Sequence, residues 1–385
     1  MGSRLHRLLI TCCPLLLAVL VACGSAFAQG GARWLTIEFP RDSPVLPVSS
    51  DLGPISVHQH GMSMALGIHT SLMLRNTGNR TICGLTLRVE AQDLTPSGKA
   101  SVTVPSLMVQ PGEVFPVAIN VELRRPFDAK TEGPIIQISL DCALFSDLTA
   151  YGPDKLNSRR ALVVYELEAR RDRQYLAGLV QAQQWTELRQ VLNFGLVDLN
   201  PPQLGFELLR GGAQANGRNE QAVPVGVVLF RGSPVQPTGG AAKLSGNEIR
   251  APQVDVKNTS QRAVRNVEMG WILRDERGRD FVAGSVATAV SLGPVQTERL
   301  TEQGTLRFSR PGGQPMSIGA VMAFVNDVEY ADGNVWIPSR RDIIEATSDP
   351  ILRRALATSP EQQRLEDVYR RKGMSGLEAE LIKMK

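Results

Sequence analysis

The feature that most constrains this chain is an internal repeat, in which one series of β-type elements recurs about 180 residues later with different side chains. The matching blocks keep the same order: residues 72–78 (LMLRNTG) with 254–260 (VDVKNTS), 84–91 with 266–273, 140–151 with 321–330, and 158–160 (SRR) with 339–341 (SRR). Because this order is unlikely to arise by chance, we expect a tandem duplication that folds into two similar units.

Both copies have the pattern of short β-strands. Leu85, Leu87 and Val89 alternate with polar residues, and Gly, Pro, Asn and Asp separate the apolar runs. Each copy also carries an Asn-Thr step, at Asn76 and Asn258, and Asn suits a turn between two strands. The pattern predicts one β-sandwich of Greek-key order over residues 33–165 and a second over residues 203–341.

Two segments change to helical periodicity. In the connector 166–199, apolar residues recur at helical spacing, which predicts a helical hairpin or a bent helix. In the C-terminal segment 342–385, Asp349 and Ser359 each precede a proline as helix caps, and Gly373 ends the longer helix. We expect these helices to pack on their own sandwich or on its neighbour, the alternative being an exposed tail that binds a partner.

With this strand order and the Asn-Thr turn, residues 50–165 and 245–340 resemble the immunoglobulin-like modules of bacterial exported and adhesion proteins. The resemblance implies a mainly β protein with helical appendages, in which each of two tandem immunoglobulin-like β-sandwiches is followed by α-helices. It concerns the fold and implies no particular activity.

Composition narrows the class of protein. The 385 residues suffice for two or three compact domains, and 43% hydrophobic with 21% charged residues fits neither a disordered chain nor a multi-span membrane protein. A formal net charge of +4 gives no sign of a nucleic-acid partner.

The N-terminus has the pattern of a secretory signal peptide over residues 1–28. Arg4 and Arg7 precede an apolar run, and a small-residue cleavage site ends at Ala28. The run is too short for a comfortable bilayer span. An alternative is a lipobox, residues 20–24 (LVACG), in which Cys23 is lipidated and anchors the protein to the outer membrane. Either pattern predicts export to the periplasm or cell envelope.

Removal of this leader leaves two cysteines, Cys83 and Cys142. An even pair in an exported protein favours a disulfide, and in an immunoglobulin-like order the two strands that carry them are neighbours. The corresponding positions of the second copy, near Arg265 and Ala323, lack both cysteines together. The alternative is two free, buried thiols.

One segment, residues 58–64, has the pattern of a metal site. His58, His60, Met62 and Met64 alternate, so on a single strand they would share one face, and imidazole with thioether suits copper. His69 is the remaining histidine of the mature chain. The alternative is an ordinary strand with Met as core filler, because copper sites usually draw ligands from more than one strand.

Catalytic signals are weak. Glycine-rich phosphate loops, dinucleotide fingerprints and nucleophile motifs are missing from the sequence, and we expect no cofactor. Carboxylates at strand ends could pair as glycosidase acids, and nearby aromatic residues could rim a binding surface. These are Asp141, Asp147, Asp327 and Glu329, with Tyr151, Tyr330 and Trp336.

The sequence therefore favours a non-catalytic envelope protein that binds another envelope protein or surface component through the turns at residues 146–157 and 326–335. A periplasmic copper-binding protein is the second hypothesis, and a carbohydrate-active or other hydrolase is the third.

Overall fold

The computed structural model of this chain describes residues 35–53, 56–60, 63–91, 99–126, 136–193, 205–209, 220–310, 314 and 316–383. Over these residues the protein is mainly β, with five helices, as the sequence predicted. The expected signal peptide, including Cys23 and Ala28, lies outside the described residues.

The N-terminal β-unit consists of two sheets that share one core. Its strands are β1 (Leu35–Glu38), β2 (Val45–Leu52), β3 (Ser56–His60), β4 (Ser63–Asn76), β5 (Ile82–Ala91), β6 (Lys99–Val104), β7 (Val114–Pro126), β8 (Ile136–Phe145) and β9 (Ala150–Tyr151). One sheet has the order β1-β8-β5-β6, with β9 on β8, and the other has the order β2-β4-β3, with β7 on β4. Leu72 and Phe115 from one sheet pack against Leu87 and Ile138 from the other.

The C-terminal β-unit repeats this two-sheet arrangement, except that one strand connects its two sheets. Its strands are β10 (Gly205–Leu209), β11 (Gln221–Val227), β12 (Val235–Ser245), β13 (Glu248–Asn258), β14 (Val264–Asp275), β15 (Asp280–Leu292), β16 (Thr297–Thr301), β17 (Thr305–Ser309), β18 (Ile318–Tyr330) and β19 (Val335–Trp336). Strand β11 pairs first with β12 and then, in parallel, with β18, so it joins both halves into one sheet. The parallel pair β1 and β8 is its counterpart in the N-terminal β-unit.

The two Asn-Thr steps have the same structural role in both units. The buried side-chain amide of Asn76 donates to the carbonyls of Arg80 and Val109, and that of Asn258 donates to the carbonyls of Arg262 and Leu292. Each asparagine therefore satisfies the backbone of its own turn and of a second loop, which explains why the amide is kept in both copies.

A second shared element was missed in the sequence. Residues 43–47 (SPVLP) match residues 233–237 (SPVQP), and in both units the serine hydroxyl donates to the carbonyl two residues later, Val45 or Val235. The backbone N–H of Thr77 donates to the carbonyl of Pro44, and that of Thr259 donates to the carbonyl of Pro234. The repeat thus extends further towards the N-terminus than the matched blocks indicated.

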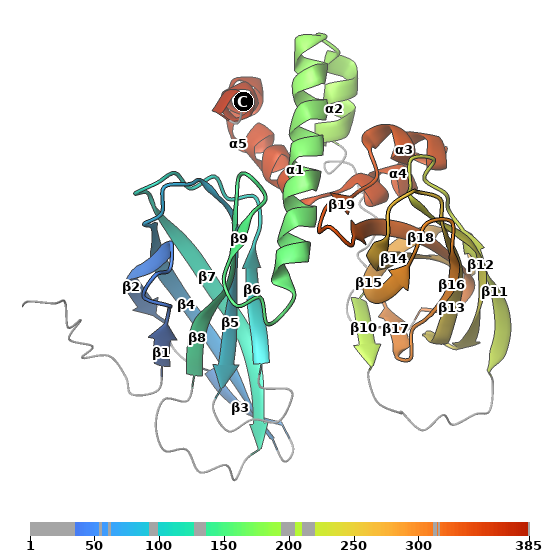
Figure 1. The fold of residues 1–385 in the computed structure, drawn as a ribbon, viewed down its shortest axis with the longest axis horizontal. Helices are drawn as coiled ribbons and strands as arrows, with labels where there is room; N and C mark the ends of the chain where they lie inside the picture. The colour runs from blue at the N-terminus through green and yellow to red at the C-terminus, as the bar shows by residue number, and fades with distance from the viewer. Residues whose placement is uncertain are drawn as a thin grey trace, which may run out of the picture.

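Five helices complete the described structure: α1 (Ser158–Gln181), α2 (Trp185–Asn193), α3 (Arg340–Ala346), α4 (Pro350–Ala357) and α5 (Pro360–Lys383). The helical hairpin expected in the connector is present, but α1 begins at Ser158 rather than near residue 166. Helix α1 lies between the two β-units (Figure 1). None of the described helices is long and apolar enough to cross a bilayer.

The start of α1 is fixed by a distant residue. Asn157 at the N-cap has a left-handed backbone, with φ 54°, and its side chain makes no capping bond. Instead Asp141, fully buried in β8, accepts hydrogen bonds from the backbone N–H groups of Lys155 and Leu156 and from the Ser158 hydroxyl. Asp141 of β8 therefore holds the loop that leads into α1, and Asp154 of this loop accepts the N–H of Arg159 in the first turn of the helix.

The C-terminal caps are confirmed. Asp349 accepts from the N–H of Ile351, Ser359 accepts from the N–H of Gln362, and Gly373 (φ 66°) breaks the helical backbone within α5. Leu365 and Leu377 of α5 pack on Leu176 of α1 and Leu188 of α2. The described part of α5 is therefore not the exposed tail that the sequence left open.

Candidate functional site

The copper hypothesis placed His58, His60, Met62 and Met64 on a single strand, whereas the structure divides this segment between two strands. Residues 56–60 and 63–76 form the antiparallel pair β3 and β4, in which His58 pairs with Ala65, His60 with Ser63, and Met64 with Gln59.

The other proposed ligands add little to a metal centre. Met62 lies outside the described residues, His58 is exposed, and His69 hydrogen-bonds Asn120. Among the described residues no group of three or more His, Cys, Asp or Glu side chains is placed to hold a metal ion. Copper binding by this segment stays a prediction.

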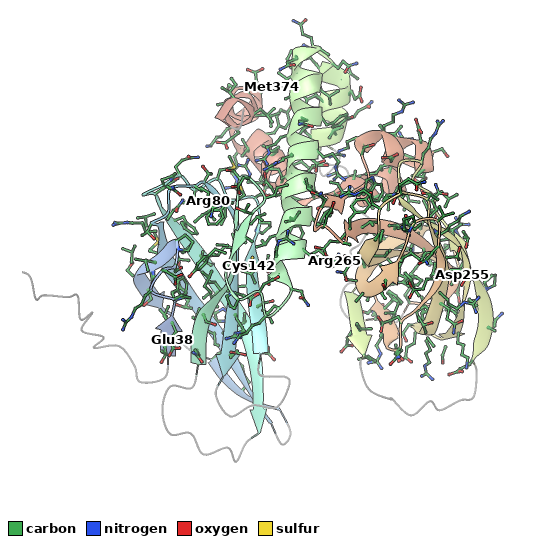
Figure 2. The ribbon with its side chains drawn as sticks, in the orientation of Figure 1. Glu38, Arg80, Cys142, Asp255, Arg265 and Met374 are labelled. Atoms are coloured by element: carbon green, nitrogen blue, oxygen red, sulfur yellow. The ribbon has the colours of Figure 1, made fainter. Side chains whose placement is uncertain are left out.

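The two cysteines lie in neighbouring strands, as expected, but both are free thiols in this structure. Cys142 pairs with Thr86, three residues beyond Cys83, so the cysteines are offset by about 10 Å along the strand direction. A disulfide needs Cα atoms within about 7 Å. Burial raises the pKa of each thiol to about 12. Figure 2 shows Cys142 on β8 beside α1.

The four candidate glycosidase acids take separate structural roles. Asp141 caps α1, whereas Asp147 binds the Thr149 hydroxyl and Arg80 at a surface turn. Asp327 and Glu329 both lie on β18 and face α1, where they pair with Arg160 and Arg159.

The aromatic residues near the strand ends also have defined contacts. Tyr151 donates its hydroxyl to Asp42, and Arg262 stacks on the Tyr330 ring at 3.7 Å, as Arg80 does on Phe145 in the N-terminal β-unit. These stacked pairs are corner packing. Trp336 borders a cavity.

An acidic pair marks the contact between α1 and the C-terminal β-unit. Glu268 of β14 and Asp327 of β18 are directly opposed, and Arg160 of α1 bridges them with two contacts of 2.6 Å. Burial and the neighbouring Glu268 raise the pKa of Asp327 well above its usual range, while Arg160 opposes this rise. Asp327 is fully buried, so the pair holds α1 to the sheet and is closed to a substrate.

A second buried acid gathers three helices. Asp172 of α1 pairs with Arg171 at 2.8 Å and with Arg340 of α3 at 2.8 Å, and it accepts from the Ser359 hydroxyl before α5. Arg171 also donates to the backbone carbonyls of Pro338 and Ala357. Because all these bonds converge on one carboxylate, the helical layer is tied together at this point.

Beside this carboxylate lies an open groove of about 740 Å³ between α1 and the segment that links β19 to α3. Its described lining contains no carboxylate and combines basic with aromatic and aliphatic residues: Leu167, Arg170, Arg171, Gln174, Tyr175, Val335, Trp336, Ile337, Pro338, Ser339, Arg340 and Arg341. We call this the basic groove. Sequence analysis missed it because it joins residues of α1 to residues of the β19–α3 segment, about 170 positions apart in the chain.

Comparisons with known proteins give no family. No protein-family model and no curated protein matches the chain. Among solved structures, a β-glucosidase from Kluyveromyces marxianus has 11% sequence identity and a TM-score of 0.17 over 69% of this chain and 45% of its own. A red sea bream transglutaminase has 10% identity and a TM-score of 0.09 over 71% of this chain and 30% of its own. Likenesses this low carry no argument about fold or activity.

Proposed function

We propose that this chain is a non-catalytic exported protein of the cell envelope, with two tandem immunoglobulin-like β-sandwiches, each followed by helices, that arose by duplication. We further propose that it works as an interaction module, and that the basic groove docks an acidic, extended segment of a partner protein from the envelope. The groove replaces the strand-end turns as the main candidate surface.

The composition of the basic groove carries this proposal. Arg170, Arg171, Arg340 and Arg341 line it together with Trp336 and Tyr175, and Trp, Tyr and Arg are the residues that dominate binding energy at protein interfaces. Carboxylates behind the groove, such as Asp172, hold two of these arginines by ion pairs. Arg170 and Arg341, whose side chains are 38% and 82% exposed, are the guanidinium groups that an incoming carboxylate would reach.

The structural use of the buried acids supports a scaffold rather than an enzyme. Asp141, Asp172 and Asp327 are each fully buried, and each bonds a residue outside its own element, 17, 187 and 167 positions away in the chain. Their carboxylates fix the position of α1 relative to both β-units, so the two walls of the groove are held at a constant spacing.

Binding of a fluorescein-labelled peptide of alternating glutamate and leucine, followed by anisotropy, tests the proposal. Arg341→Glu should weaken binding by roughly five- to tenfold and reduce its salt dependence, because a rim charge acts mainly by attraction. Arg341 is 82% exposed, so the change should not disturb folding.

The matched control is Arg371→Glu, at an arginine of α5 whose side chain is 76% exposed. Equal loss of affinity in both variants, or equal binding of a lysine-leucine peptide, would contradict an acidic partner at this groove.

A further inference from the structure

A second cavity lies close to the basic groove and has a different chemistry. It encloses about 200 Å³ between α1 and α2 on one side and α3 and α4 on the other. Its walls include Val191, Ile343, Ile344 and Pro350, so most of its surface is apolar.

The cavity contains one cation without an anionic partner. Arg353 of α4 donates from Nη2 to the carbonyl of Thr347 at 2.9 Å, but its Nε is buried and has no hydrogen-bond partner among the described residues. No described carboxylate lies within ion-pair distance of Arg353, whereas Arg340 and Arg354, which also line the cavity, pair with Asp172 and Glu366.

The one carboxylate in the lining is already engaged. Glu187 of α2 accepts a hydrogen bond of 2.9 Å from the Tyr175 hydroxyl. Arg353 is half-buried as a residue, but its Nε is a buried donor, and a buried donor without a partner costs about 1–3 kcal/mol. Arg353 therefore has an unused donor that a bound carboxylate would satisfy.

We propose that this cavity binds a small carboxylate with an apolar body, whose carboxylate pairs with Arg353 while its ring or branched chain contacts Ile343, Ile344 and Val191. An apolar cavity of about 150 Å³ holds one benzene molecule, so this space suits a single ring or a short branched chain. The planar guanidinium supplies the fork geometry that carboxylates favour. The inference goes beyond the interaction role proposed above and does not depend on it.

Titration of the full exported chain with benzoate, followed by calorimetry and by the NMR signals of the cavity methyl groups, tests the inference. Benzyl alcohol, of similar size but neutral, should bind at least tenfold more weakly. Arg353→Gln should weaken benzoate binding at least tenfold, and Arg353→Lys should give an intermediate loss because it keeps the charge without the fork.

The matched control is Arg189→Gln, at an exposed arginine of α2 outside the cavity lining, and it should leave benzoate affinity unchanged. A measurement on the unaltered protein needs no variant to fold: affinity should fall as pH drops below about 4, where the carboxylate of the ligand is protonated. Equal binding of benzyl alcohol, an unchanged affinity in Arg353→Gln, or an affinity that does not depend on ligand ionisation would each overturn the proposal.

Discussion

Glu168 is an ionisable side chain of α1 that the fold holds in an unfavourable environment for its charge. Burial raises the pKa of this carboxyl to about 7, and the nearby Asp172 and Glu268 raise it further while Arg171 lowers it. The folded protein therefore favours the protonated acid. The stability that Glu168 contributes is fully present below its unfolded pKa, near 4.5, and is lost as pH rises through about 7.

We expect Glu168→Gln to remove this titration. The free energy of unfolding of the variant minus that of the unaltered protein should rise by about 1–3 kcal/mol from pH 5 to pH 8, measured with urea. Glu276→Gln, at an exposed position, should show no such gain. If the pH dependence of Glu168→Gln matches that of the unaltered protein, Glu168 does not titrate in this range.

The cysteines give a second test at this scale. In a chain that begins at residue 29, we expect two thiols to react with a thiol reagent after denaturation without reductant. In the native protein at pH 8, alkylation should be roughly a thousandfold slower than for an ordinary thiol, because a pKa of about 12 leaves little thiolate. A mass two protons lower and no titratable thiol would show that Cys83 and Cys142 form the disulfide instead.

These residues also show what the sequence could not decide. The immunoglobulin-like strand order correctly placed Cys83 and Cys142 in adjacent strands, but the register of β5 with β8, which includes a bulge at Cys83, gives their offset. The alternation of His58 to Met64 likewise indicated a strand and missed the change of direction between β3 and β4. Register and reversal depend on pairing with distant strands, which a local pattern does not encode.

Among the elements, α1 and α3 occupy corresponding places in the two copies but begin in different ways. Ser339 caps α3 within a local capping box with Asp342, whereas α1 depends on Asp141, which is 17 residues before Ser158. Only the first kind of start leaves a signal in the neighbouring sequence. The two caps that the sequence predicted, Asp349 and Ser359, are also local, because each accepts a backbone N–H two or three residues further along the chain.

We expect Asp141→Ala to destabilise the protein by about 3 kcal/mol, because it leaves two backbone N–H groups and a hydroxyl without their acceptor. Amide hydrogen exchange should quicken in the first turn of α1. Ser339→Ala should cost only about 1 kcal/mol and affect α3 alone. An equal cost in both variants would mean that the remote acceptor adds nothing beyond an ordinary cap.

For the whole molecule, the divergence of the two copies determines how they are joined. At one register position the N-terminal β-unit pairs Thr86 with Cys142, and the C-terminal β-unit pairs Glu268 with Asp327, so Cys142 corresponds to Asp327 and not, as the sequence alignment indicated, to a position near Ala323. The first pair belongs to a buried face on which Leu162 of α1 packs, and the second pair binds Arg160 of the same helix. Helix α1 therefore makes this apolar contact with the N-terminal β-unit and this cationic contact with the C-terminal β-unit. Neither contact would form if the two β-units changed places.

The repeat indicated the two β-units, but nothing in the sequence indicated the ion pairs that join α1 to the C-terminal β-unit. We call this contact the joint. In the sequence Arg159 and Arg160 only formed part of the repeated SRR block, and their partners Glu329 and Asp327 are about 170 residues away. Arg265, on β14, also pairs with Glu329 and lies on the side of the C-terminal β-unit that faces α1 (Figure 2).

The joint can be tested through Arg160. We expect Arg160→Met to destabilise the protein by about 3–5 kcal/mol, because it leaves the buried Asp327 and its neighbour Glu268 without a cation. Small-angle scattering should then show a larger radius of gyration, and hydrogen exchange should increase in β14 and β18 while β4 and β7 stay protected.

A triple variant distinguishes the effect of losing the contact from the energetic cost of leaving two acids without a cation. Adding Glu268→Gln and Asp327→Asn to Arg160→Met should restore most of the thermal stability, since a neutral buried group costs far less than a charged one. Arg299→Met, which removes an exposed pair with Asp255, should change little. If Arg160→Met leaves both stability and radius unchanged, the two β-units are not held through α1 at this contact, and the constant spacing of the basic groove loses its physical basis.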